Sequence, residues 1–74
     1  MTVSELGKTL QAMYDNAEKG DKVAMIHLFG VMYAHEIRKT NAVKDIAGTA
    51  GIPASYVTEI NKGVRLSRYV RPIK

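Results

Sequence analysis

The segment from residue 46 to residue 63, IAGTAGIPASYVTEINKG, most constrains how this chain can fold. Two short stretches with apolar residues at helical spacing flank a single Gly-Ile-Pro. Gly ends a helix in the left-handed conformation at the least cost, and Pro fits the first turn of a new helix, where its missing N–H is not needed. We therefore predict one helix at about 42–50 and a second at about 53–62, joined by a tight turn.

The apolar positions of these two helices fit a helix-turn-helix, in which a turn of three to four residues containing Gly joins two helices. Ala47 is small where the helices must cross, Gly51 makes the turn, and Ile52 returns the chain to the core. An ordinary pair of packed helices is the alternative explanation. The expected core of the motif consists of Ile46, Ala47, Ala50, Gly51, Ile52, Val57 and Ile60.

The N-terminal part of the chain is also predicted to be helical. Thr2 and Glu5 have the spacing of a capping box, in which each side chain bonds to the backbone N–H of the other residue. Apolar residues then recur at steps of three and four as far as Ala17, which predicts one amphipathic helix ended by Gly20-Asp21. The chain shows no strand alternation, internal repeat or low-complexity segment.

A second helix, expected at about 22–39, is apolar around most of its circumference. Such a helix should lie at the centre of the fold, with neighbours on several faces. Gly30 in its middle costs about 1 kcal/mol relative to Ala, so its presence there predicts a close helix crossing. The first helix is expected either to cover this central helix or to form a dimer contact.

Chain length and composition favour one compact all-α domain over residues 1–74, a bundle of four to five short helices. The helix-turn-helix is expected at 43–62 and a basic C-terminal tail at 64–74, with one helical turn at 66–70. The chain has no cysteine, which excludes disulfides and thiolate metal sites. Because the core of so small a domain is limited, a homodimer interface is one way to support it.

The excess positive charge lies after the second helix of the pair. Residues 1–63 contain seven Lys or Arg and seven Asp or Glu, whereas residues 64–74 add four cations and no acid, which gives the net charge of +4. Such a patch suits an anionic partner, most often nucleic acid. The alternative is a solvated basic tail that helps solubility.

Other chemistries have weak support in the sequence. His27, His35 and Glu36 form the one cluster suggestive of a metal, but the histidines are eight residues apart and no third ligand is placed, so no metal is expected. The absence of a nucleophile–base motif, a phosphate loop and a Gly-rich fingerprint argues against an enzyme or a cofactor, and no small-molecule ligand is evident. The apolar-rich stretch 23–37 is too short and too polar to span a bilayer.

The stretch from Val43 to Ile60 resembles the helix-turn-helix of the phage-repressor/Cro-like DNA-binding proteins. The resemblance covers roughly a quarter of the chain and leaves the first helix outside it. It is carried by Ile-Ala at 46–47, Ala-Gly-Ile at 50–52, Val57 and Ile60, followed by Asn-Lys-Gly at 61–63.

The resemblance implies a recognition helix at 53–62 in the major groove of double-stranded DNA. It implies a DNA-binding function, in a small bacterial-type transcriptional regulator or as a module of a larger protein, located in the cytoplasm with the nucleoid. The implied base contacts are Ala54, Ser55, Tyr56, Thr58 and Glu59. The implied phosphate contacts are Asn61, Lys62, Arg65, Arg68 and Arg71.

Residues 53–60 depart from the usual pattern of such a helix, because they contain none of Arg, Lys, Asn and Gln, the commonest side chains that bond base edges. Glu59 can accept a hydrogen bond from cytosine, but an acid there also repels phosphate, and it has Lys62 three residues away as an alternative partner. Tyr56 fits the edge of the core as well as it fits DNA. The alternative function is therefore a protein–protein interaction module that keeps the helix-turn-helix shape without binding DNA.

Overall fold

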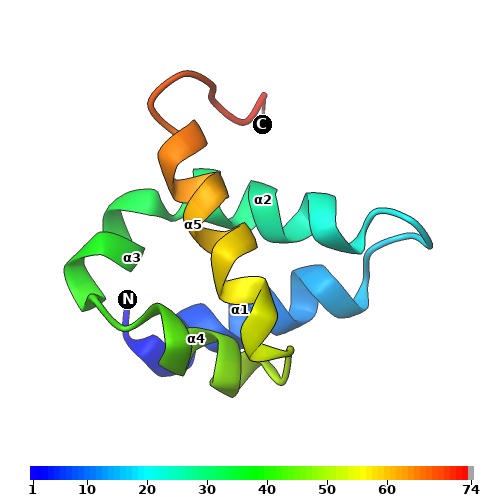
Figure 1. Ribbon diagram of the computed structural model, residues 1–74, viewed down its shortest axis with the longest axis horizontal. Coiled ribbons are helices and arrows are strands. Elements are labelled where there is room, and N and C mark those ends of the chain that lie inside the picture. Colours follow the sequence, from blue (N-terminus) through cyan, green and yellow to red (C-terminus); the bar gives the residue numbers. More distant parts are fainter. Residues whose placement is uncertain (74) are drawn as a thin grey trace.

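The computed structural model describes residues 1–73 as helices joined by turns, with no strand among them (Figure 1). This confirms the all-α prediction. Lys74, one of the four cations of the predicted tail, lies outside the described residues. The elements are α1 (Val3–Asp15), α2 (Lys22–Met32), α3 (Ala34–Thr40), α4 (Val43–Ala50), the 3₁₀ turn η1 (Ala54–Tyr56) and α5 (Val57–Leu66).

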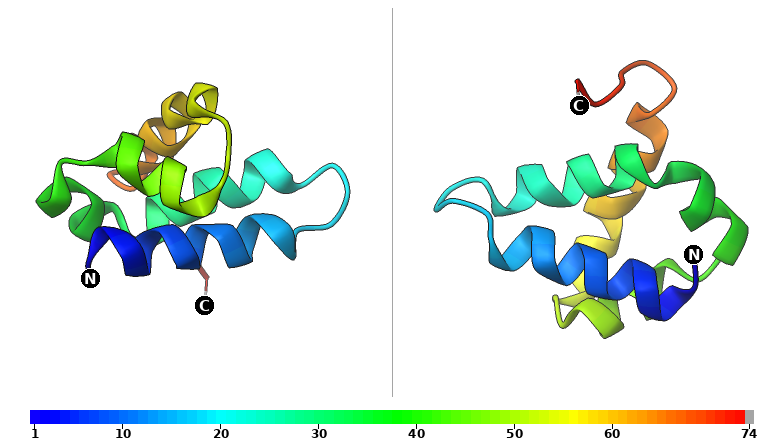
Figure 2. Two further views of the ribbon diagram at one scale, coloured as in Figure 1. Left: turned by 90° about the horizontal axis from the view of Figure 1, so that it is seen from below. Right: turned by 180° about the vertical axis from the view of Figure 1, so that it is seen from behind.

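The helices α1 and α2 form an antiparallel pair joined by a loop, and the other helices pack around this pair (Figures 1 and 2). The capping box predicted at the start of α1 is present, since the Thr2 hydroxyl accepts from the Glu5 N–H and the Glu5 carboxylate accepts from the Thr2 N–H. α4 packs against α1, and α5 packs across α2. Because α2 contacts α1, α3 and α5, its predicted central position is confirmed.

The core is apolar and draws on all five α-helices. Among the described residues no polar or charged residue is buried, so burial of aliphatic and aromatic side chains holds the fold together. Each fully buried side chain of this kind stabilises the folded state by roughly 1.5–3 kcal/mol. The largest fully buried side chains are Phe29, Leu6, Leu10, Ile26, Ile37, Ile46 and Ile60.

Two glycines bring α2 and α5 into backbone contact. A Cβ atom on Gly30 would lie 2.6 Å from the carbonyl oxygen of Ile60 and 2.8 Å from the Cα atom of Gly63. A Cβ atom on Gly63 would in turn overlap the carbonyl oxygen of His27. Neither position has space for a larger residue, so the close crossing predicted from Gly30 is confirmed.

The single helix predicted at 22–39 is wrong. The chain breaks at Tyr33, where φ is −115° and ψ is 22°, and continues as α3 in a new direction. Contacts with distant parts of the chain hold α3 in place. The Arg38 Nη2 donates to the carbonyl oxygen of Val64 at 3.2 Å, and the N-terminal amine lies 2.7 Å from the Glu36 carboxylate.

The bounds predicted for the second helix of the pair, 53–62, are also wrong. The chain forms a 3₁₀ turn over Ala54–Tyr56 and then α5, which passes through Gly63 to Leu66. Gly63 therefore serves the crossing with α2 and does not end the helix. The turn predicted at 66–70 follows α5 directly, since the Tyr69 N–H donates to the Leu66 carbonyl oxygen at 2.9 Å.

The first helix is shorter than predicted, because α1 ends at Asp15 and not at Gly20-Asp21. The loop that follows is tied back by Lys22, whose Nζ donates to the Tyr14 carbonyl oxygen at 2.8 Å. The same ammonium group lies 4.7 Å from the centre of the Tyr14 ring. The Lys22 ammonium group thereby gives a hydrogen-bond donor to one of the last carbonyl groups of α1. The helix ends there although the apolar spacing in the sequence continues to Ala17.

Gly30→Ala should lower the free energy of unfolding by about 1–3 kcal/mol, because the added methyl group forces α2 and α5 apart. Gly48→Ala is the matched control, since Gly48 lies in α4 with nothing within 4 Å of its Cβ position. That change should raise the free energy of unfolding by up to about 1 kcal/mol. Urea denaturation measures both. Equal stability of the Gly30→Ala variant and the unchanged protein would contradict the close crossing.

Candidate nucleic-acid interface

The turn between α4 and α5 is closed by backbone geometry that requires Gly51. This residue has φ +75° and ψ 20°, a left-handed conformation that Gly adopts without strain. The Gly51 N–H donates to the carbonyl oxygen of Gly48 at 3.1 Å, and the Ile52 N–H donates to that of Ala47 at 3.2 Å. The turn thereby satisfies the last carbonyl groups of α4 and redirects the chain within three residues.

The apolar side chains of this segment face the interior of the protein. Val57 is half-buried and packs against the core, and Gly51 is exposed at the turn. Because the apolar side chains of α5 point inward, the opposite side of this helix is left uncovered. The buried members of the segment are Ile46, Ala47, Ala50, Ile52 and Ile60.

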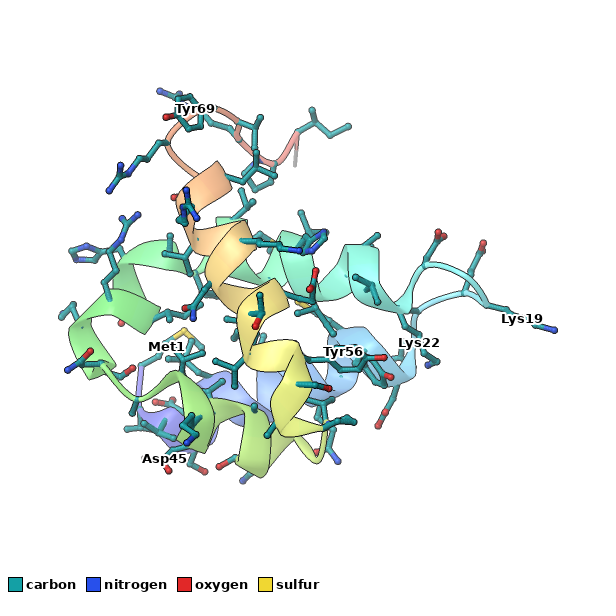
Figure 3. The ribbon with its side chains drawn as sticks, viewed as in Figure 1. Met1, Lys19, Lys22, Asp45, Tyr56 and Tyr69 are labelled. Carbon is teal, nitrogen blue, oxygen red and sulfur yellow. The ribbon has the colours of Figure 1, made fainter. Side chains whose placement is uncertain are left out.

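The outward face of α5 is the surface formed by the exposed residues of η1 and α5 as far as Arg65. These residues recur at steps of one, three and four, as expected for one side of a helix. The side chains at its start are small and uncharged, and those at its end are basic. Figure 3 shows α5 in front of α2, with this face toward the viewer. The members are Ala54, Ser55, Thr58, Asn61, Lys62 and Arg65.

Two of the residues expected to contact bases are only partly accessible. Tyr56 is half-buried, and its ring centre lies 6.2 Å from that of Tyr14 on α1 (Figure 3). The neighbouring Tyr14 raises the pKa of the Tyr56 hydroxyl, so Tyr56 stays neutral over an even wider pH range. Tyr56 therefore presents one edge of its side chain to solvent from the border of the outward face.

Glu59 is held by partners on both sides. Its Oε1 lies 2.7 Å from the His27 Nε2 on α2, and its Oε2 lies 3.3 Å from the Lys62 Nζ. The side chain of Glu59 is only 21% exposed. The hydrogen bond with His27, followed by that with Lys62, lowers the pKa of the Glu59 carboxyl below its ordinary value of 4.5. The acid of α5 is therefore drawn toward α2 and partly neutralised.

The basic residues that follow are exposed and lie close together in sequence. Arg65 is in the last turn of α5, and Arg68 and Arg71 follow it in the tail. Within residues 1–73 none of these three guanidinium groups takes part in an ion pair. Arg38, by contrast, is engaged by the carbonyl oxygen of Val64. The cations after α5 are therefore available to an anionic partner.

Comparison with known families identifies the domain. A family model described as an HTH-like domain matches residues 2–73. The chain belongs to the HTH-like domain family. The match supports a helix-turn-helix domain, and it does not single out the phage-repressor/Cro-like proteins within that broad class. No curated protein and no solved structure gave a significant match.

Sequence reasoning missed two residues that shape the interface of this HTH-like domain. His27 holds Glu59 across 32 positions of sequence, and Arg38 bonds the backbone of α5 across 26. No local motif connects residues so far apart. The available signal was the presence of His27 as a polar side chain in the apolar stretch that forms α2, whereas Arg38 lies on α3, a separate and more polar helix.

Among residues 1–73, no group of three or more His, Cys, Asp or Glu side chains is arranged to hold a metal ion. No helix in that range is both long enough and apolar enough to cross a membrane.

Glu59→Gln should reduce the dependence of stability on pH in the acidic range. Because the folded-state pKa of Glu59 is lowered, its contribution is fully present above the ordinary pKa of 4.5 and is lost as the pH falls through the lowered value. The stability difference between the unchanged protein and the variant should therefore be larger at pH 5 than at pH 2.5, as measured by urea denaturation. Glu18→Gln, on the exposed α1–α2 loop, is the control. The same difference at both pH values would contradict the role of this carboxylate.

Proposed function

We propose that this HTH-like domain binds double-stranded DNA, with α5 in the major groove. The observation that supports this most is the outward face of α5. It is uncovered by the rest of the described chain. Beyond Lys62, which pairs with Glu59, it leads into Arg65, Arg68 and Arg71, which form no ion pair within residues 1–73. A major groove about 12 Å wide admits one α-helix, and phosphate groups border it on both sides.

The start of the outward face is suited to contacts with base edges. Ser55 and Thr58 carry hydroxyl groups that both donate and accept hydrogen bonds, and Ala54 offers a methyl group for contact with thymine. Tyr56 and Glu59 belong to the proposed base contacts from the border of this face, where each exposes only part of its side chain. Small polar side chains allow α5 to approach the bases closely.

The end of the outward face and the tail are suited to the DNA backbone. Lys62, Arg65, Arg68 and Arg71 would neutralise phosphate groups and release the counterions that surround DNA. Asn61 is exposed on the same face and would donate its amide N–H to a phosphate oxygen. Such contacts set affinity and register, and base contacts set the preference for sequence.

The proposal extends to the wider role of the protein. A domain of this kind with a sequence preference is suited to a transcriptional regulator, here of the phage-repressor/Cro-like type, acting at the nucleoid in the cytoplasm. A homodimer would place two copies of α5 on successive half-sites. Leu6 and Leu10, large apolar residues of α1, are buried, so they would not contribute to a homodimer contact through that helix.

A protein-interaction module is the second candidate. The observation that favours it is the absence of Arg, Lys, Asn and Gln from residues 53–60. Under this alternative the exposed hydroxyl groups of α5 would contact a protein, and the cations would add only a general attraction to acidic partners. DNA binding would then be weak at physiological salt and would not depend on the residues of η1 and α5.

Arg65→Ala and Arg68→Ala should each reduce the slope of log affinity against log salt by about one unit, because each removes about one phosphate contact. Affinity should fall alike on all sequences. Fluorescence anisotropy over a salt series measures the slope. Lys19→Ala is the control, since Lys19 lies at the end of the α1–α2 loop, away from α5 (Figure 3). An unchanged slope in both arginine variants would remove these residues from the interface.

Thr58→Ala should change which DNA sequences are preferred and leave the salt slope as it is. Thr58 is exposed in the middle of the outward face, and a mismatched base pair in a binding site costs about 1–3 kcal/mol, to which a lost hydroxyl contact would contribute. Selection of bound sequences from a random duplex pool, followed by sequencing, measures the preference. Thr9→Ala on α1 serves as the control. An identical selected set from the Thr58→Ala variant would show that this part of α5 does not contact bases.

A further inference from the structure

A shallow depression of about 220 Å³ lies beside the end of α5 and is lined by four residues, Lys62, Arg65, Leu66 and Tyr69. Their spacing of three, four and seven residues places them along one side of the helix and of the turn that follows it. The N–H of Tyr69 donates to the Leu66 carbonyl oxygen, which holds this turn against the end of α5. The depression therefore continues the outward face of α5 beyond its last turn.

Tyr69 differs from the other tyrosines of the chain. Tyr14, Tyr33 and Tyr56 are half-buried, and each has an aromatic ring as a neighbour within about 6 Å. Tyr69 is 80% exposed and has no aromatic neighbour among the described residues (Figure 3). Its ring contributes little to the core, so it is free to pack against a partner.

The lining combines two kinds of chemistry. Lys62 and Arg65 supply positive charge, whereas Leu66, 43% exposed, and the Tyr69 ring supply apolar surface. A small inorganic anion would use only the cations. A paired base of a duplex is stacked between its neighbours, so its face is not available to a tyrosine ring. A sugar–phosphate unit has both an anionic group and an apolar face, and it matches both parts of the lining.

We propose that these four residues, which we call the backbone clamp, bind one sugar–phosphate unit of duplex DNA beside the groove that α5 enters. Lys62 and Arg65 contact the phosphate, and the deoxyribose packs on Leu66 and the Tyr69 ring. The clamp rests on the proposed DNA-binding function and adds to it a non-ionic contact that fixes how far α5 advances along the groove. Tyr69 thereby sets register without reading sequence.

The clamp predicts a particular pattern of effects for Tyr69. Tyr69→Ala should weaken duplex binding by roughly three- to tenfold, the range expected when one aromatic contact is lost. The loss should be the same on different sequences, and the salt slope should not change, because no charge is removed. Tyr69→Phe should recover most of the loss, since it restores the ring. Ile73→Ala is the control, because Ile73 is fully exposed in the same tail and does not line the clamp.

The experiment measures anisotropy with a fluorescent duplex at several salt concentrations for the unchanged protein and these three variants, with folding checked by circular dichroism. It is repeated with duplexes that carry one neutral methylphosphonate at each position in turn. At one position the substitution should weaken binding of the unchanged protein and have a smaller effect on Arg65→Ala, which keeps only the Lys62 contact with that phosphate. Additive losses at every position would overturn the shared phosphate contact.

Three other results would overturn the clamp. Equal binding by Tyr69→Ala and the unchanged protein would show that the ring is not used. A larger loss on a single-stranded oligonucleotide than on the duplex would show that the ring stacks on a base and not on deoxyribose. If the unchanged protein fails to bind the duplex at low salt, the proposed function itself fails and the clamp with it. This last result is distinct, because it does not depend on any variant.

Discussion

The backbones of α2 and α5 touch where Gly30 meets Gly63, and the candidate interface depends on this contact. Packed helices are usually 8–10 Å apart because side chains separate them. Two glycines at one crossing let α5 lie directly on the central helix, with Ile60 buried behind it. The opposite side of α5 is then held outward on a rigid support, which is what a helix that enters a DNA groove requires.

The same crossing determines the charge of that surface. It brings His27 on α2 within 2.7 Å of Glu59, the one acid of α5, and Lys62 approaches the same carboxylate from the next turn. An acid at this place would otherwise repel phosphate. Drawn toward α2, it leaves the uncovered side of α5 neutral at its start and basic at its end. The packing of α5 on α2 and the charges along α5 therefore both make its outward face the side suited to an anionic partner.

The sequence alone predicted the features that depend on a single residue type at a single position. The capping box at Thr2, the left-handed turn at Gly51 and the close approach at Gly30 each depend on one residue type at one place. Features that depend on distant partners were not predictable in this way. The break at Tyr33 has no Pro near it and no Gly at the break itself, and α3 is held by contacts with the N-terminus and α5. In the sequence, Gly63 looks like a residue that ends a helix. Its role in packing against α2 becomes visible only in the folded structure.

The central claim is that the outward face of α5 meets DNA, and a titration followed by heteronuclear NMR tests it most directly. A ¹⁵N-labelled sample of this 8.2 kDa protein is titrated with a random-sequence duplex at low salt. If α5 enters the groove, the amide signals of residues 54–69 should shift progressively, while those of the exposed side of α1 stay in place. A well-dispersed spectrum with no shifts, or shifts confined to α1 and α3, would contradict it.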